Sequence, residues 1–71
     1  MLSNFLRTVD PAYKIEFRSD RERNLLIVRV TRGLLSNEAM ISYEFLCDDL
    51  QLIAVIRDTI DLLDDAFNNY D

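Results

Sequence analysis

The C-terminal third of the chain, residues 48–69, has the apolar periodicity of a single amphipathic helix. At about 100° per residue, its apolar side chains cover roughly half of the helix circumference. They are Leu52, Ile53, Val55, Ile56, Thr59, Ile60, Leu62, Leu63, Ala66 and Phe67. A stripe of little more than about 100° is enough to pack a helix against one core. The wider face therefore predicts a helix that covers other elements of the fold and also contacts a second surface.

The chain has 71 residues and is predicted to form a single domain over residues 1–71. Below about 70–80 residues, one hydrophobic core seldom supplies more than about 3–5 kcal/mol. The single cysteine, Cys47, excludes an intrachain disulfide, and the absence of histidine argues against a structural zinc site. We expect no cofactor and no metal. Oligomerisation is the remaining way to stabilise so small a domain, so the sequence predicts a homodimer.

Residues 1–32 are predicted to contain a short helix and two strands. Leu2, Phe5, Leu6 and Val9 have helical spacing, with Ser3 as the expected N-cap, and Pro11 disfavours helix at Asp10. Residues 13–18 alternate strictly, with Tyr13, Ile15 and Phe17 on one face, which indicates a half-buried strand. A polar loop follows at 19–24. Residues 25–32 are expected to form a second strand. Its core-facing side chains are then Leu26, Val28 and Val30, and Leu25 and Ile27 are apolar side chains on the outer face.

Residues 34–46 permit two interpretations. Ile41, Tyr43 and Phe45 alternate with polar residues and favour a third strand. Alternatively, a helix capped by Ser36 gives a β-hairpin followed by one long helix or a helical hairpin. We favour the strand because a lone hairpin is marginally stable in water. In addition, Asp48 and Gln51 have the spacing of a capping box that starts a new helix, with Cys47 and Leu52 as the accompanying apolar pair.

The predicted fold is therefore α+β: a short N-terminal helix, a three-stranded antiparallel meander, and a long C-terminal amphipathic helix across its inner face. One helix stripe packs on the sheet, comprising Ile53, Ile56, Ile60, Leu63 and Phe67. The neighbouring stripe stays partly uncovered and comprises Leu52, Val55, Thr59, Leu62 and Ala66. The residues expected at the dimer interface are Leu25, Ile27, Leu52, Val55 and Leu62.

Charge is unevenly divided along the chain. Residues 1–33 carry seven basic and four acidic groups, a net charge of +3, whereas residues 34–71 carry one basic and nine acidic groups, a net charge of −8. A chain with net charge −5 is a poor generic binder of nucleic acid, because phosphate contacts supply most non-specific affinity. No apolar run reaches the ~18 residues of a membrane span, and residues 1–7 lack the features of a signal peptide. We expect no membrane association and a reducing, cytoplasmic setting.

The residue types argue against an enzyme. Histidine, the commonest general base, is absent. Cys47 has Asp48 and Asp49 beside it, which oppose a thiolate, so a packing role is expected. Asp58, Asp61, Asp64 and Asp65 are expected to cluster on the outer face of the C-terminal helix. Such carboxylates suit magnesium only where a cavity and substrate phosphates complete the site, and an exposed helix face is not a cavity.

These aspartates are nevertheless the best candidate for a functional contact. Asp61, Asp64 and Asp65 lie toward the C-terminal end of the helix, where the helix dipole disfavours negative charge. The sequence thus predicts a small non-enzymatic interaction or regulatory module whose acidic helix face binds a basic partner protein. One alternative is a DNA-mimicking inhibitor of a nucleic-acid-binding protein. Another is a nucleic-acid-binding module that uses the arginine-rich hairpin, which contains Arg18, Arg21, Arg23, Arg29 and Arg32.

Overall fold

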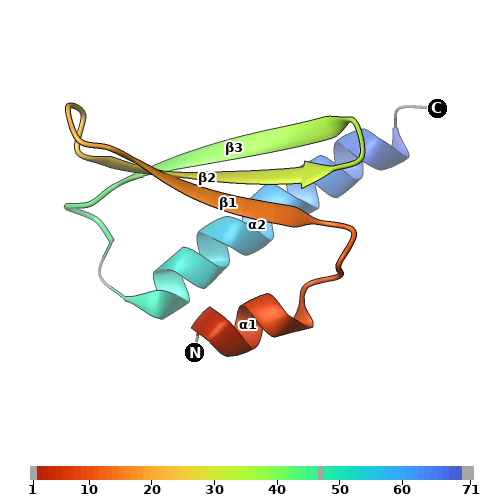
Figure 1. Cartoon of the computed structure of the whole chain (residues 1–71), viewed down its shortest axis with the longest axis horizontal. Coiled ribbons are helices and arrows are strands. Elements are labelled where there is room, and N and C mark those ends of the chain that lie inside the picture. Colours follow the sequence, from red (N-terminus) through yellow and green to blue (C-terminus); the bar gives the residue numbers. More distant parts are fainter. Residues whose placement is uncertain (1, 47, 70–71) are drawn as a thin grey trace.

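The computed structural model, which describes residues 2–46 and 48–69, confirms the α+β fold. The elements in chain order are α1 (Leu2–Thr8), β1 (Lys14–Asp20), β2 (Leu25–Arg32), β3 (Leu35–Ser42) and α2 (Asp49–Asn68). The three strands form one antiparallel sheet in the order β1–β2–β3 (Figure 1). Strand β3 excludes the alternative of a helix that begins at Ser36.

The meander follows from the residues at its two turns. Gly33 has a φ of 61°, and glycine at the first position of a two-residue hairpin turn is typical of type II′. The turn pairs Arg32 with Leu35, so β3 starts as soon as β2 ends. The β1–β2 turn ends at Asn24, whose φ of 54° is one that asparagine tolerates better than most residues. Because β1 continues to Asp20, the turn spans only residues 21–24 and is two residues shorter than the predicted loop at 19–24.

The third strand lies earlier in the chain than predicted. Ile41 does face the core, opposite Leu26, but Tyr43 and Phe45 lie beyond the strand and are exposed. The inward residues that precede Ile41 are Leu35, Asn37 and Ala39. Asn37 is polar, yet it is accommodated because its side-chain amide donates a hydrogen bond to the Thr59 carbonyl of α2 at 3.3 Å. The predicted bounds were wrong because this inward face is not uniformly apolar.

Helix α2 begins where the capping pattern predicts. The Asp48 side chain accepts a hydrogen bond from the Gln51 backbone N–H at 2.9 Å, which satisfies a donor that the helix leaves free. The predicted apolar partner in this cap, Cys47, lies outside the described residues. In α1, by contrast, the helix begins at Leu2, so Ser3 lies within its first turn and the prediction of Ser3 as N-cap was wrong.

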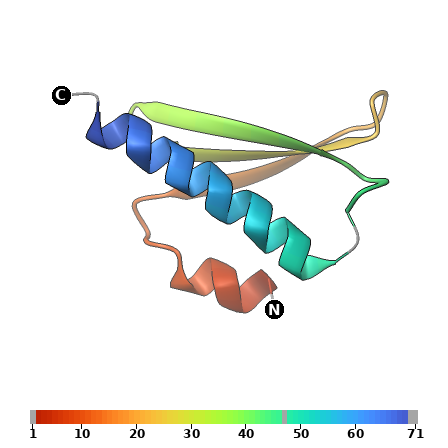
Figure 2. The ribbon, with the colours of Figure 1, turned by 180° about the vertical axis from the view of Figure 1, so that it is seen from behind.

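The core lies between the sheet and α2. Its fully buried members are Val28 and Val30 of β2 and Ile56 and Leu63 of α2. Helix α1 lies beside α2 and adds Leu2, Phe5 and Leu6 to the edge of this core (Figure 2). No described element covers the opposite face of the sheet. The molecule is therefore a flat two-layer structure, measuring 38 × 27 × 15 Å.

The buried face of α2 is rotated relative to the prediction. Thr59, assigned to the uncovered stripe, is only 3% exposed, and its hydroxyl donates to the Val55 carbonyl at 2.7 Å. Phe67, assigned to the core stripe, is 39% exposed, and Ile60 is half-buried. The rotation brings α2 toward β3, where Asn37 bonds to the backbone of Thr59. A polar threonine belongs to the core because its hydroxyl is satisfied within the helix.

Candidate functional site

The exposed side of α2 carries an acidic helix face, which we define as Asp58, Asp61, Leu62 and Asp65. The three aspartates are exposed, and within residues 2–46 and 48–69 none of them forms an ion pair. Leu62 is 62% exposed and lies one helical turn from both Asp58 and Asp65. The surface therefore combines an exposed aliphatic side chain with flanking carboxylates.

Asp64 does not belong to this face, contrary to the prediction of a four-aspartate cluster. It is half-buried, and its carboxylate accepts hydrogen bonds from the Tyr13 hydroxyl and from Arg32 Nη1, the latter at 3.1 Å. The Arg32 guanidinium also lies 4.2 Å from the centroid of the Phe67 ring and 5.4 Å from that of Tyr13. This arrangement, the Tyr13–Arg32–Asp64–Phe67 cluster, joins the residue before β1 and the end of β2 to the C-terminal half of α2.

The electrostatics of the cluster are those of a structural contact. The hydrogen bond to Asp64 raises the pKa of the Tyr13 hydroxyl, and burial and the negative charge of Asp64 raise it further. Arg32 opposes this with a smaller effect, because a cation favours the phenolate. Tyr13 is thus held in its protonated form, which suits a hydrogen-bond donor rather than a base or nucleophile.

The basic residue of α2 does not neutralise the acidic helix face. Arg57 lies one turn before Asp61, but its guanidinium is placed over the Phe5 ring of α1, 5.5 Å from the centroid. This contact links α2 to α1. The carboxylate of Asp61 therefore remains available to an external cation.

The structure separates the five residues predicted for the dimer interface. Leu25 and Ile27 lie on the outer face of the sheet, whereas Leu52, Val55 and Leu62 lie on α2, which covers the inner face. Ile27 is only 4% exposed in the single chain, with Arg18 and Met40 opposite it in the register. Leu52 packs against the core and Val55 is half-buried. Of the five, only Leu62 is freely exposed, so no single flat surface contains them all.

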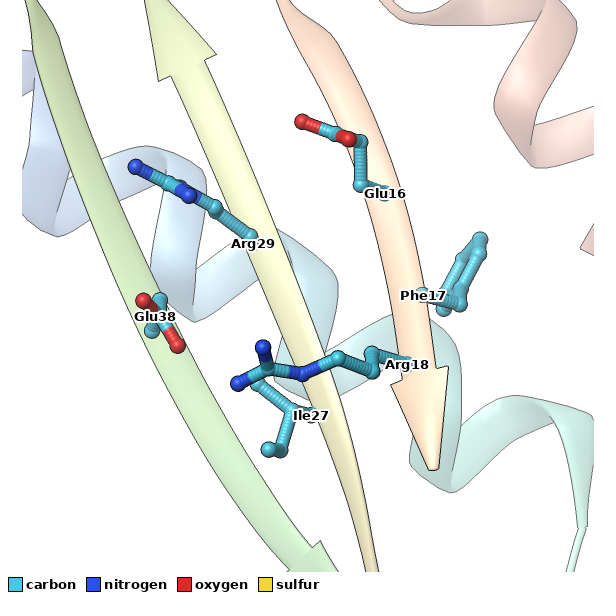
Figure 3. Close-up of a pocket in the computed structure, with 6 residues that line it drawn as sticks. All are labelled: Glu16, Phe17, Arg18, Ile27, Arg29 and Glu38. Carbon is cyan, nitrogen blue, oxygen red and sulfur yellow. The ribbon is translucent and has the colours of Figure 1, made fainter. Parts of the chain in front are cut away.

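The outer face of the sheet carries a row of charges instead of an apolar patch. Glu16, Arg29 and Glu38 lie directly opposite one another across β1, β2 and β3. They surround a shallow depression of about 250 Å³ that Arg18 and Ile27 also line (Figure 3). Within the described residues, no three histidine, cysteine, aspartate or glutamate side chains are close enough together to hold a metal ion. The alternating charges can interact with a polar ligand or with another chain.

The arginines of the arginine-rich hairpin are less available for binding phosphate than the sequence suggests. Arg32 is engaged by Asp64, and Arg23 Nε bonds Asp20 at 2.7 Å. These hydrogen bonds from Arg23 lower the pKa of the Asp20 carboxyl. Arg29 is flanked by two glutamates. The hairpin therefore lacks a continuous basic stripe of the kind that tracks a phosphate backbone.

Sequence patterns did not reveal the Tyr13–Arg32–Asp64–Phe67 cluster. Tyr13 and Asp64 are 51 residues apart and meet only because α2 folds back over the sheet. The acidic helix face, by contrast, follows from helical periodicity alone. Comparison with protein-family models, with characterised proteins and with solved structures finds no match to this chain. Neither helix is long and apolar enough over its described residues to cross a bilayer.

Proposed function

We propose that this protein is a small non-enzymatic interaction module that binds a basic surface of a partner protein through its acidic helix face. The observation that carries the proposal is the contrast among the four aspartates of α2. Asp64 is used within the fold, whereas Asp58, Asp61 and Asp65 are exposed without an ion-pair partner in the described part of the chain.

The energetics of the free chain support an external partner. The last turn of α2 contains no basic residue, and Asp65 lies there. Negative charge at a helix C-terminus costs about 0.3–1 kcal/mol, and the i, i+4 pair Asp61–Asp65 costs about 0.2–0.5 kcal/mol more. Folding gains nothing from these charges, while a basic partner gains three charged contacts around Leu62. An exposed aliphatic side chain within a polar rim is the usual composition of an interface.

We also propose that the chain is a homodimer. The single chain exposes 5293 Å² of surface, whereas a compact monomer of this mass exposes about 4,600 Å². Its radius of gyration is 12.5 Å, against about 11 Å for a compact domain of this length. The open outer face and the two sheet edges, which no described strand pairs, contribute to this exposed surface, and pairing with a second copy would reduce it.

The test of the acidic helix face begins with an affinity capture that identifies the partner, followed by titration at two salt concentrations. We expect Asp61→Asn combined with Asp65→Asn to weaken binding about tenfold or more while the protein keeps its fold, since loss of a charged contact typically costs a factor of this size. Wild-type affinity should fall with added salt, because exposed charges are screened over about 10 Å at 0.1 M.

The matched control is Glu22→Gln combined with Glu44→Gln, which removes the same charge from exposed positions away from α2. Equal affinity of the Asp61/Asp65 variant and the wild type would assign these aspartates to a merely solvated face. If the captured partner is itself a nucleic-acid-binding protein and DNA displaces it, the acidic face acts as a DNA mimic. Salt-sensitive retention of the protein on heparin would instead favour the arginine-rich hairpin.

A further inference from the structure

Strand β1 is an unpaired edge of the sheet. One side pairs with β2, and the other side carries no described strand. Helix α1 packs on α2 and leaves this edge open (Figure 1). An open edge presents backbone N–H and C=O groups that can pair with another chain.

The outer face of β1 has a strictly alternating charge pattern. Successive side chains on this face are Lys14, Glu16, Arg18 and Asp20. Within the described residues, the side chains of Lys14, Glu16 and Arg18 form no ion pair. Asp20 is bonded to Arg23, and its carboxylate retains further acceptor positions. This pattern is complementary to itself when the strand direction is reversed.

We propose that a second copy of this chain pairs with β1 in antiparallel orientation, with Phe17 on the two-fold axis, so that two sheets become one six-stranded sheet. In this register every outward pair has opposite charges, with Lys14 opposite Asp20 of the second copy and Glu16 opposite Arg18 of the second copy. The two-fold axis repeats each pair, which gives four attractive pairs. Opposite charges on directly facing residues stabilise a strand pair, and like charges destabilise it.

The charges select this register over its neighbours. Centring the pair on Glu16 places Glu16 opposite itself and Lys14 opposite Arg18. Centring it on Arg18 places Arg18 opposite itself and Glu16 opposite Asp20. Both arrangements oppose like charges, while centring on Ile15 or Ser19 leaves half of the charged side chains unpaired. Charged edge strands ordinarily prevent association, but this alternation permits one partner in one register.

The apolar side of β1 supports the same arrangement. Phe17 is 43% exposed and extends away from β2, past the edge of the sheet (Figure 3). Next to it, a cavity of about 290 Å³ opens between β1, α1 and the α1–β1 connection, and apart from Asp10 its lining is largely apolar, with Leu6, Val9, Pro11, Tyr13, Ile15 and Phe17. At the two-fold axis the two Phe17 rings face each other beside these cavities, and aromatic pairs contribute beyond the area that they bury.

This inference rests on the proposed homodimer and names its surface, which differs from the residues predicted from the sequence. It is independent of the acidic helix face. The proposed pairing removes the β1 edge from solvent and leaves Leu62 and its neighbouring aspartates exposed.

Charge reversal at the two central positions tests the register. Arg18→Glu alone, or Glu16→Arg alone, places like charges opposite each other twice. Each variant should raise the dimer dissociation constant about tenfold or more. Added salt should partly restore its association by screening the repulsion. The matched controls are Arg21→Glu and Glu22→Arg in the adjoining turn, which make the same charge changes without facing the second copy and should leave dimerisation unchanged.

Mixing the two single variants gives the decisive measurement. A chain with Glu16→Arg and a chain with Arg18→Glu are complementary to each other in this register, although each repels its own copy. Native mass spectrometry with one chain isotope-labelled should therefore detect a heterodimer in excess over both homodimers. The double variant Glu16→Arg/Arg18→Glu should dimerise like the wild type. Recovery of association in both cases also establishes that the single variants are folded.

A cross-link tests the axis directly. Facing residues of an antiparallel pair have Cα atoms about 4.5–5.5 Å apart, within the range of a disulfide. In a Cys47→Ser background, Phe17→Cys should form a covalent dimer under mild oxidation, and Met40→Cys on the other edge strand should not. If the charge reversals leave the dimer dissociation constant unchanged and position 17 does not cross-link, this interface is overturned but the homodimer is not. A wild-type chain that stays monomeric at all concentrations would overturn both.

Discussion

Asp61 and Asp64 lie three residues apart on α2 and have different surroundings. Asp64 accepts hydrogen bonds from Tyr13 and Arg32, whereas Asp61 faces solvent. The same carboxylate therefore stabilises the fold at one position and costs free energy at the other. The two side chains point about 60° apart around the helix, and this difference is enough for Asp64 to reach Tyr13 and Arg32 while Asp61 does not.

We expect Asp64→Asn to lower the free energy of unfolding by about 1 kcal/mol, because a charged hydrogen bond contributes about 1.5–3 kcal/mol and partial exposure reduces this. Asp61→Asn, with the same chemical change, should keep or slightly raise stability, since it relieves repulsion near the helix C-terminus. For a domain of this size 1 kcal/mol corresponds to a shift of about 4–8 °C in Tm, which calorimetry resolves. Equal Tm values for the two variants would contradict the assignment of Asp64 to the cluster.

The raised pKa of Tyr13 predicts a loss of stability at alkaline pH. A group whose pKa is higher in the folded state contributes stability that is complete below its unfolded value, here 10.0, and that is lost as pH rises through the folded value. Denaturant unfolding from pH 8 to 11 should therefore show a decline that is smaller in Tyr13→Phe. The comparison between the two proteins, and not the decline itself, is the measurement. Parallel curves would mean that Tyr13 does not donate to Asp64.

At the scale of elements, the phase of α2 decides which apolar side chains are core and which are surface. Ile56 is fully buried against β2, and Leu62, six residues later, is exposed. The wide apolar helix face predicted from the sequence contains both residues and does not show which of them is buried. In the observed rotation, α2 contacts Asn37 of β3 on one side and Phe5 of α1 on the other.

Ile56→Ala should cost about 2–5 kcal/mol, the usual range for emptying a buried aliphatic site, which is comparable with the entire stability of a domain this small. Leu62→Ala should change stability by no more than about 0.5 kcal/mol, as for surface substitutions in general. Chemical denaturation followed by circular dichroism checks both. Similar losses in the two variants would place the helix in a different rotation.

At the scale of the whole molecule, the described residues form two layers and leave one sheet face and both sheet edges uncovered (Figure 1). Within the described residues only six apolar side chains are buried, and one of them, Ile27, lies on the outer face of the sheet. This shape is the physical reason for the proposed homodimer, because a core this small leaves a single chain little stability of its own.

A homodimer should therefore have a thermal midpoint that rises with protein concentration, because unfolding is coupled to dissociation. Light scattering after gel filtration should give twice the 8.3 kDa monomer mass at micromolar concentration and a lower average on dilution. A sharp peak at the monomer mass, with a midpoint independent of concentration, would contradict the proposed homodimer.

Local signals in the sequence were sufficient for most of the elements. The 3.6-residue period and the Asp48–Gln51 spacing predicted α2 and its cap, and the alternation over residues 25–32 predicted β2 with its inward face. Hydrogen bonds in a helix and side-chain alternation in a strand depend on near neighbours, so a single sequence contains this information. The acidic positions of α2 follow from the same periodicity.

Contacts between distant segments decided the rest. The bounds of β3 depend on the turn at Gly33 and on an inward asparagine that a helix backbone satisfies. The burial of Thr59 depends on which side of α2 meets β3, and the separation of Asp64 from the other aspartates depends on a tyrosine 51 residues away. Periodicity places a residue on a face of its own element. Only the packing of one element on another determines what that face meets, and therefore which charges remain free to bind a partner.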